Sequence, residues 1–337
     1  MSAGTQRPLR PGDVVEVRPP AEILATLDES GALDSMPFMP EMLQYVGRRF
    51  TVSKRVEKIC DTVGGTGGSL RMRDTVFLED LRCDGSGHGG CQAGCRIYWK
   101  EAWLRRSEQT EPPPNPGPAP ETSTPLEELA RKGARAVRAR NGGAPVEVYR
   151  CQATEAFAAT TPLSLYEPGQ YVREIVSGNV GLIRFLRVAA RALTQRVGHK
   201  LGVMGHLPLE PRGESGPSSA PLGLQPGDWA QVKSPEEIAM TLDERGRNRG
   251  LWFDTEMLPY CGGTFRVKDR VQRIINEFTG EMLELKHDAV ILEGVVCSGD
   301  RSAQRWFCPR AIYPYWREAW LRRVDAPTTT VDRSSAR

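Results

Sequence analysis

The sequence is short of histidine and has no long hydrophobic run. Only four of its 337 residues are histidine. They stand far apart, at positions 88, 199, 206 and 287, which argues against a catalytic site with three histidine ligands. No run of eighteen apolar residues is present, so we expect no transmembrane segment. The opening residues, MSAGTQRPLRPGD, lack the apolar stretch of a secretory signal, and this predicts a cytoplasmic protein.

Familiar catalytic motifs are also absent. The chain has no P-loop, no G-x-G-x-x-G after a strand, no H-E-x-x-H, no G-x-S-x-G and no kinase signature. These absences exclude the enzyme classes that short motifs reveal, and we assign no catalytic residue. The charge is nearly balanced, with 45 basic and 42 acidic side chains and a formal net charge of +3. Nucleic-acid binding therefore gains no support from the total charge.

What the chain does contain is an internal repeat. PGDVVEVRPPAEILATLDESG (11–31) returns as PGDWAQVKSPEEIAMTLDERG (226–246), and EMLQYVGRRFTVSKRVEKI (41–59) returns as EMLPYCGGTFRVKDRVQRI (256–274). Near the end of each copy, YWKEAWLRR matches YWREAWLRR. The sequence therefore predicts two copies of one domain, at 10–106 and 225–323.

Proline-rich, polar segments separate these copies from the middle of the chain. Residues 107–123 and 206–224 have too few large apolar side chains to build a core, so both are interpreted as linkers. They bracket a middle module at 124–205, which we expect to be mostly helical. Residues 324–337 are predicted to be a disordered tail.

Within each copy, hydrophobic residues alternate with polar ones. Val15 and Val17, then Phe50 and Val52, follow the period of a strand, and one short helix is expected between these strands. The predicted fold class is mainly β with α: two small SH3-like β-barrels flanking the middle module. GDxVxV followed by GxxFxV resembles SH3-like barrels of the KOW type. EML-Y-G--F-V with W-EAWL resembles an uncharacterised bacterial family with duplicated barrels of this kind, a resemblance that implies no activity.

A cluster of potential metal ligands precedes the last strand of the first copy. Cys83, His88, Cys91 and Cys95 have the spacing C-x4-H-x2-C-x3-C among several glycines. Four such donors can surround one zinc ion, and this is the predicted metal site. Cys60 is an alternative fourth donor, and a set of four thiolates would also suit an iron–sulfur cluster. Buried thiols without a metal, or a reactive cysteine, are the competing interpretations.

The second copy preserves only part of this cluster. Cys297 and Cys308 align with Cys83 and Cys91, but Ile312 replaces Cys95, and no histidine lies between the two cysteines. We therefore expect a degenerate site in the second copy.

The middle module contains two basic segments that we expect to be helical. Residues 124–142 are predicted to form a solvated helix. In residues 179–200, apolar side chains recur at helical spacing, while Arg184, Arg187 and Arg191 share another face. We expect this helix to pack in the core or on a partner, with contact to an anionic membrane surface as the alternative.

These observations predict a cytoplasmic binding or scaffold protein with a structural zinc, whose partner is a protein or a small ligand. One alternative is a metal- or thiol-dependent enzyme that uses the same cluster. The other is RNA binding by the tandem barrels. The basic residues that would serve it lie near Phe50 and Phe265; they are Arg48, Arg49, Arg55, Lys58, Arg266, Arg270 and Arg273.

Overall fold

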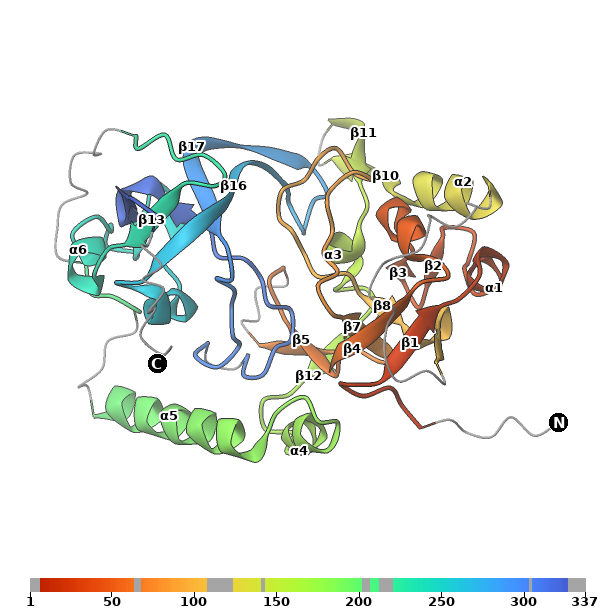
Figure 1. Ribbon diagram of the computed structural model, residues 1–337, viewed down its shortest axis with the longest axis horizontal. Helices are drawn as coiled ribbons and strands as arrows, with labels where there is room; N and C mark the ends of the chain where they lie inside the picture. Colours follow the sequence, from red (N-terminus) through yellow and green to blue (C-terminus); the bar gives the residue numbers. More distant parts are fainter. Residues whose placement is uncertain are drawn as a thin grey trace, which may run out of the picture. The chain divides into compact units, whose positions relative to one another are not determined.

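The computed structural model describes residues 7–63, 68–107, 124–140, 143–201, 207–211, 221–302 and 305–326. As predicted, the described chain is mainly β with several helices (Figure 1). Most of both predicted linkers, and the predicted tail from residue 327 onward, lie outside the described residues. Val324, which we had placed in the tail, instead ends a strand.

The chain divides into two compact units. One comprises Met1–Met204, Arg273–Glu284 and Cys297–Ile312, and the other comprises Gly205–Gln272, Leu285–Val296 and Tyr313–Arg337. The first unit therefore contains the first repeat, the middle segment and two short stretches of the second repeat.

The first repeat forms a five-stranded sheet with the order β8-β7-β4-β1-β9. Its strands are β1 (Val14–Val17), β4 (Arg49–Arg55), β7 (Thr75–Leu78), β8 (Trp99–Lys100) and β9 (Leu104–Arg106). Shorter elements connect them: α1 (Pro20–Leu24), β2 (Ala32–Leu33), β3 (Met36–Pro37), the 3-10 helix η1 (Pro40–Tyr45) and η2 (Glu101–Trp103). β1 is amphipathic because Val15 and Val17 are buried while Glu16 is partly exposed.

The second repeat builds the same sheet from corresponding strands, in the order β18-β17-β16-β13-β19. These are β13 (Trp229–Val232), β16 (Thr264–Ile275), β17 (Met282–Leu292), β18 (Trp316–Arg317) and β19 (Leu321–Val324). Its connecting elements are α6 (Pro235–Ala239), β14 (Arg247–Asn248), β15 (Leu251–Trp252), η3 (Thr255–Tyr260) and η4 (Glu318–Trp320). In both sheets the described strand order is open, so closure into an SH3-like barrel stays a prediction.

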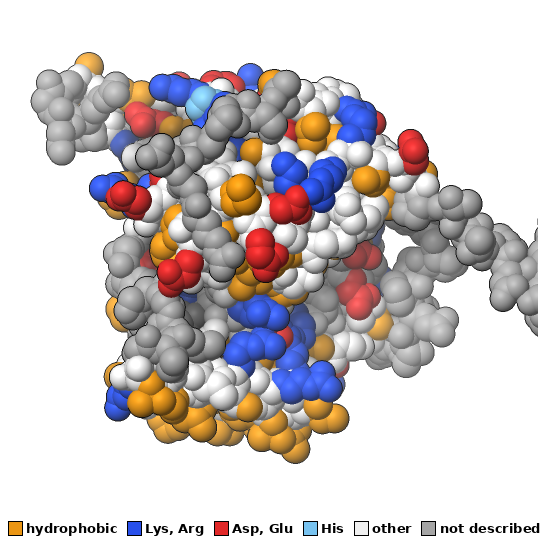
Figure 2. Space-filling model, turned by 90° about the vertical axis from the view of Figure 1, so that its left-hand side faces the viewer, with side chains coloured by type: hydrophobic (Ala, Val, Ile, Leu, Met, Phe, Trp, Pro, Cys, Tyr) orange, Lys and Arg blue, Asp and Glu red, His pale blue; other side chains and the backbone are white. Residues whose placement is uncertain are grey.

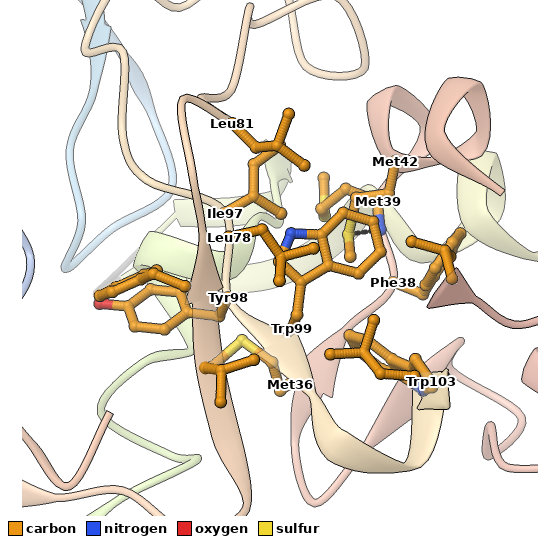
Figure 3. Packing of buried hydrophobic residues seen from close by; sticks show 14 of the residues in the cluster. Met36, Phe38, Met39, Met42, Leu78, Leu81, Ile97, Tyr98, Trp99 and Trp103 are labelled. Carbon is orange, nitrogen blue, oxygen red and sulfur yellow. Dashed lines mark hydrogen bonds between the residues drawn. The ribbon is translucent and has the colours of Figure 1, made fainter. Parts of the chain in front are cut away.

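The tryptophans common to both repeats lie in their cores. Trp99 and Trp103 are fully buried, and Phe38 packs edge-on against Trp103 with ring centroids 5.3 Å apart (Figure 3). In the second repeat, Phe253 and Trp320 make the same contact at 5.4 Å. Such edge-to-face pairs explain why these aromatics recur at equivalent positions.

A buried hydrogen bond recurs in the same way and predicts matched losses of stability. The indole Nε1 of Trp103 donates to Thr26 Oγ1 at 3.0 Å, and Trp320 donates to Thr241 Oγ1 at 3.0 Å. Valine has the shape of threonine but no acceptor, so it would leave the indole N–H unpaired. We expect Thr26→Val and Thr241→Val each to lower the free energy of unfolding by about 1 to 3 kcal/mol, measured by urea denaturation. A loss at only one of the two positions would contradict the equivalence of the repeats.

The middle segment is less helical than predicted. Its elements are α2 (Thr124–Gly133), β10 (Arg135–Arg140), β11 (Gly143–Tyr149), α3 (Gln152–Glu155), β12 (Thr161–Leu163), α4 (Gly169–Val176) and α5 (Leu182–Lys200). The single helix expected over 124–142 is therefore wrong beyond Gly133. There the alternating sequence RAVRAR pairs with β11, and burial of Val148 in that hairpin outweighs the helix propensity of alanine and arginine.

The middle segment is also bonded to the first repeat. β12 pairs with β6 (Ser69–Arg71), which in turn pairs with β5 (Lys58–Cys60). The buried amide of Gln152 accepts from the Tyr98 N–H at 2.8 Å and donates to the Tyr98 carbonyl at 2.8 Å. These contacts join the segment to the first repeat as one compact unit.

The long helix α5 exposes the apolar face that we expected to pack in the core. Ile183, Leu186 and Leu193 on its apolar face are 69%, 57% and 63% exposed, whereas Val188 on the other face is buried. Arg184 lies on the inner side and binds Asp300 at 2.8 Å. Packing of the apolar face in the core is therefore wrong for this helix, because an ion pair and an aromatic contact hold the opposite face inward.

Candidate metal centre

Glycine-rich turns shape the loop that carries the predicted cluster. The Cys83 N–H donates to the Cys95 carbonyl at 2.8 Å, which closes the loop at its base. Gly85 has a φ of +74°, and a Cβ there would collide with the backbone of Cys91. The second repeat has the same closure, from the Cys297 N–H to the Ile312 carbonyl at 2.8 Å. The two loops therefore share a turn, although their side chains differ.

Inside this loop, Cys83 and His88 meet a carboxylate from η1. The Cys83 Sγ lies 3.4 Å from His88 Nε2 and 3.3 Å from Glu41 Oε1, to which the thiol donates. The ligand atoms of Glu41, Cys83 and His88 all lie within 4.8 Å of one another. One sulfur, one nitrogen and one oxygen donor thus face a common point, and this group could bind a metal.

The separations of these atoms suit a tetrahedral metal ion. With Zn–S near 2.3 Å and Zn–N or Zn–O near 2.0 Å, tetrahedral angles place sulfur about 3.5 Å from each lighter donor. The observed 3.3 Å and 3.4 Å are close to that edge length. The side chains therefore have nearly the spacing that a bound ion requires.

The surroundings leave the group short of hydrogen-bond partners. Glu41 and His88 are 6% and 2% exposed, and within the described chain neither Glu41 Oε2 nor His88 Nδ1 has a hydrogen-bond partner. Burial raises the pKa of the Cys83 thiol and lowers the pKa of His88. A bound cation would stabilise the thiolate and the carboxylate, whose charged forms are otherwise disfavoured by burial.

A neighbouring glycine provides the space for the carboxylate. A Cβ added at Gly87 would lie 2.5 Å from Glu41 Oε2 and 3.0 Å from a side-chain carbon of Pro40. The glycines of this loop therefore do more than allow turns, because one of them lets a side chain from η1 reach the cysteine and histidine.

The other predicted ligands lie elsewhere. Within the described residues, the group of converging ligand atoms does not include Cys91 or Cys95. Cys91 packs in the hydrophobic core, where its sulfur accepts from the Ile275 N–H at 3.4 Å. Burial raises the pKa of the Cys95 thiol to about 12. The alternative donor, Cys60, receives no support as a ligand, because it lies beside Cys308.

The sequence interpretation missed Glu41 as a ligand. Glu41 and Glu256 occupy equivalent positions in the two repeats, and this pairing was the only signal in the sequence. Because Glu41 is 42 residues from Cys83, cysteine spacing could not reveal it. Among the described residues of the second repeat, no comparable group of three ligand atoms is found.

Arginines invoked for RNA binding are engaged within their own repeats. Arg55 binds Glu57 at 2.6 Å and also contacts Glu101, while Arg270 binds Asp288 at 2.5 Å and Glu318 at 3.1 Å. These guanidinium groups orient the turns that precede the last strands, so these two arginines do not favour the RNA hypothesis.

No protein-family model, curated protein or solved structure matches this chain. In the part of the chain that the structure describes, no helix is both long enough and apolar enough to cross a bilayer.

Proposed function

We propose that this chain is a binding protein whose first repeat is stabilised by one zinc ion held by Glu41, Cys83 and His88. The observation that carries this proposal is the convergence of three donors at distances that suit tetrahedral coordination: Glu41 and His88 are buried, and Cys83 is partly buried. Zinc is favoured because it accepts mixed sulfur, nitrogen and oxygen ligands. An iron–sulfur cluster is disfavoured because such clusters are held mainly by several thiolates, and only one thiol belongs to the group.

The role proposed for this zinc is structural. It would fasten the loop between β7 and β8 to η1, two parts of one repeat that are distant in sequence. A small β module gains much of its stability from such a link, because the metal binds the folded chain and not the unfolded one. In this proposal each repeat is an SH3-like barrel, with the metal closing the first.

Zinc content tests this proposal. Full-length protein purified without added chelator is expected to contain one zinc per chain by elemental analysis. Cys83→Ser and His88→Ala should each abolish stoichiometric zinc, while Cys91→Ser should retain it. Absence of metal in the native chain would overturn the proposal, as would loss of zinc in Cys91→Ser with retention in Cys83→Ser.

A metal-dependent enzyme is the second candidate, because three protein donors leave one coordination position of a tetrahedral ion open. Cobalt-substituted protein distinguishes the two roles. Catalysis requires the open position to be accessible, so visible cobalt absorption that does not change on adding thiocyanate would exclude the enzyme. A thiocyanate-dependent shift in that spectrum would favour the enzyme.

For the binding surface itself, we propose the outward face of α5. We call this surface the apolar stripe; it consists of Leu182, Ile183, Leu186, Leu193 and Val197. Figure 2 shows hydrophobic side chains along the lower edge of one face of the molecule, at the level of α5 in Figure 1, with basic side chains just above them.

The charges of α5 favour an anionic membrane surface as the occupant. Residues 182–200 include four arginines and a lysine but no acidic residue. Arg187, Arg196 and Lys200 are exposed beside the apolar stripe. An apolar face with flanking cations is the pattern of helices that lie at the lipid interface, where the cations meet lipid phosphates.

Vesicle sedimentation tests this surface. Full-length protein is expected to bind phosphatidylserine-containing vesicles, and added salt should weaken the binding. The double variant Leu186→Asp/Leu193→Asp should lose at least about tenfold in affinity, because each leucine contributes roughly 1.5 to 3 kcal/mol when buried. Phe278→Asp, which changes an exposed aromatic outside α5, serves as the matched control. Vesicle binding that is absent, or unchanged in the double variant, would contradict the membrane proposal and leave a protein as the occupant.

A further inference from the structure

Two cysteines outside the candidate metal centre are in contact within the first compact unit. Cys60 ends β5, and Cys308 lies in the loop of the second repeat that belongs to the same unit. The Cys60 N–H donates to the Cys308 sulfur at 3.2 Å, and the Cys308 thiol hydrogen-bonds to the Cys60 sulfur. Both residues are free thiols and 6% exposed. The hydrogen bond from the Cys60 N–H places the two cysteines in direct contact.

A buried cation stands beside this pair. The guanidinium of Arg310, itself 5% exposed, lies 3.9 Å from the Cys60 sulfur. Hydrogen bonds to Thr62 at 2.9 Å and to Glu277 at 2.8 Å hold it there. The hydrogen bond from Cys308 and the charge of Arg310 lower the pKa of Cys60 to about 6. One negative charge shared by the two sulfurs is therefore stabilised at neutral pH.

A cavity lies beside one cysteine of this pair, Cys308. Its volume is about 170 Å³, and Cys308 is part of its wall. Lys54, Arg96 and Arg184 contribute positive charge to the same wall. Since a water molecule occupies roughly 30 Å³ in the liquid, a peroxide of two heavy atoms fits this space. The cations would also stabilise a departing hydroxide.

We propose that Cys60 and Cys308 form a reversible disulfide when a small peroxide enters the cavity. The Cys60 thiolate takes the proton of Cys308, which lines the cavity, and the Cys308 thiolate so formed attacks one peroxide oxygen. An S–O bond forms, the O–O bond breaks, and the departing hydroxide takes one proton from solvent to become water. The Cys60 sulfur then attacks the sulfenic sulfur of Cys308, an S–S bond forms, and the sulfenic hydroxyl leaves as a second water with the Cys60 proton. One peroxide is reduced to two waters, and two thiols are oxidised.

Peptide mapping of the full-length protein tests this inference independently of the metal. After one equivalent of hydrogen peroxide and rapid alkylation, we expect two of the eight thiols to be lost and a peptide linking Cys60 to Cys308 to appear. Dithiothreitol should restore both thiols.

Two variants test the specificity of the cross-link and the role of the neighbouring charge. Cys151 is another buried thiol, and burial raises its pKa to about 12, so Cys151→Ser should leave the cross-link unchanged. Arg310→Met should slow cross-linking at least about tenfold, because it removes the buried charge beside the thiols. The proposal is overturned if native protein under tenfold excess peroxide keeps Cys60 and Cys308 alkylatable, or if Cys308 pairs with a different cysteine.

Discussion

Removing zinc from the purified protein is expected to lower its melting temperature by about 8 to 16 °C. A ligand that binds only the folded state, at a free concentration about 1,000 times its Kd, stabilises that state by about 4 kcal/mol. For a unit of this size each kcal/mol shifts Tm by about 2 to 4 °C. The loss should be large because the chelated protein keeps Glu41 and His88 buried without their common partner. Scanning calorimetry with EDTA, followed by readdition of zinc, measures the effect.

Two variants control for nonspecific effects of the chelator. Cys83→Ser should have a lowered Tm that EDTA no longer changes, because it cannot hold the ion. Cys91→Ser should remain sensitive to EDTA, whatever its own stability, because Cys91 lies outside the group of ligand atoms. Identical melting curves for native protein with and without EDTA would show that no metal supports the fold.

Replacing Trp99 with alanine is expected to destabilise the first repeat by about 3 to 5 kcal/mol. Trp99 is fully buried, and its ring lies 6.4 Å from Phe38 and 6.1 Å from Tyr45. Removing the indole leaves a cavity that these two rings cannot fill without losing their edge-to-face contacts. Urea denaturation followed by circular dichroism measures the change.

The second repeat supplies the matched variant. Trp316 is equally buried and lies 6.3 Å from Phe253 and 6.5 Å from Tyr260, so Trp316→Ala should be destabilising to a similar degree. The two variants should differ in their response to zinc. Trp316→Ala affects the repeat without the metal group, so the EDTA-dependent shift should persist in it. A loss below about 1 kcal/mol in either variant would be inconsistent with the packing described.

The repeat was predictable because matching segments of the sequence can be aligned directly, without knowledge of tertiary contacts. The two copies match in sequence, and the structure pairs Phe38 with Trp103 as it pairs Phe253 with Trp320. Whether each sheet closes into a barrel depends on contacts between strands at its edges, which period and propensity do not specify.

The group of Glu41, Cys83 and His88 was only partly predictable from the spacing of its residues. Cys83 and His88 share one loop, so their convergence could be anticipated from glycine-rich turns. Glu41 comes from another element, and its approach depends on the absence of a side chain at Gly87. Cys91 is near in sequence, but it points into the core and contacts Ile275. Proximity along the chain therefore did not indicate which side chains converge, because that depends on tertiary packing.

The orientation of α5 was not predictable from its periodicity. The pattern identified an apolar face and a basic face correctly, but it could not say which face the rest of the chain would cover. On the inward side of the helix, Arg184 forms an ion pair with Asp300, and Phe185 stacks on Phe307 with ring centroids 5.5 Å apart. These contacts over a long sequence separation turn the apolar face outward.

X-ray absorption at the zinc edge tests the central claim most directly, because it counts the sulfur atoms around the ion. With Glu41, Cys83 and His88 as ligands, we expect one sulfur at about 2.3 Å and two or three lighter donors at about 2.0 Å. Three sulfur atoms with one nitrogen would instead indicate Cys83, His88, Cys91 and Cys95. That result would contradict the centre described here.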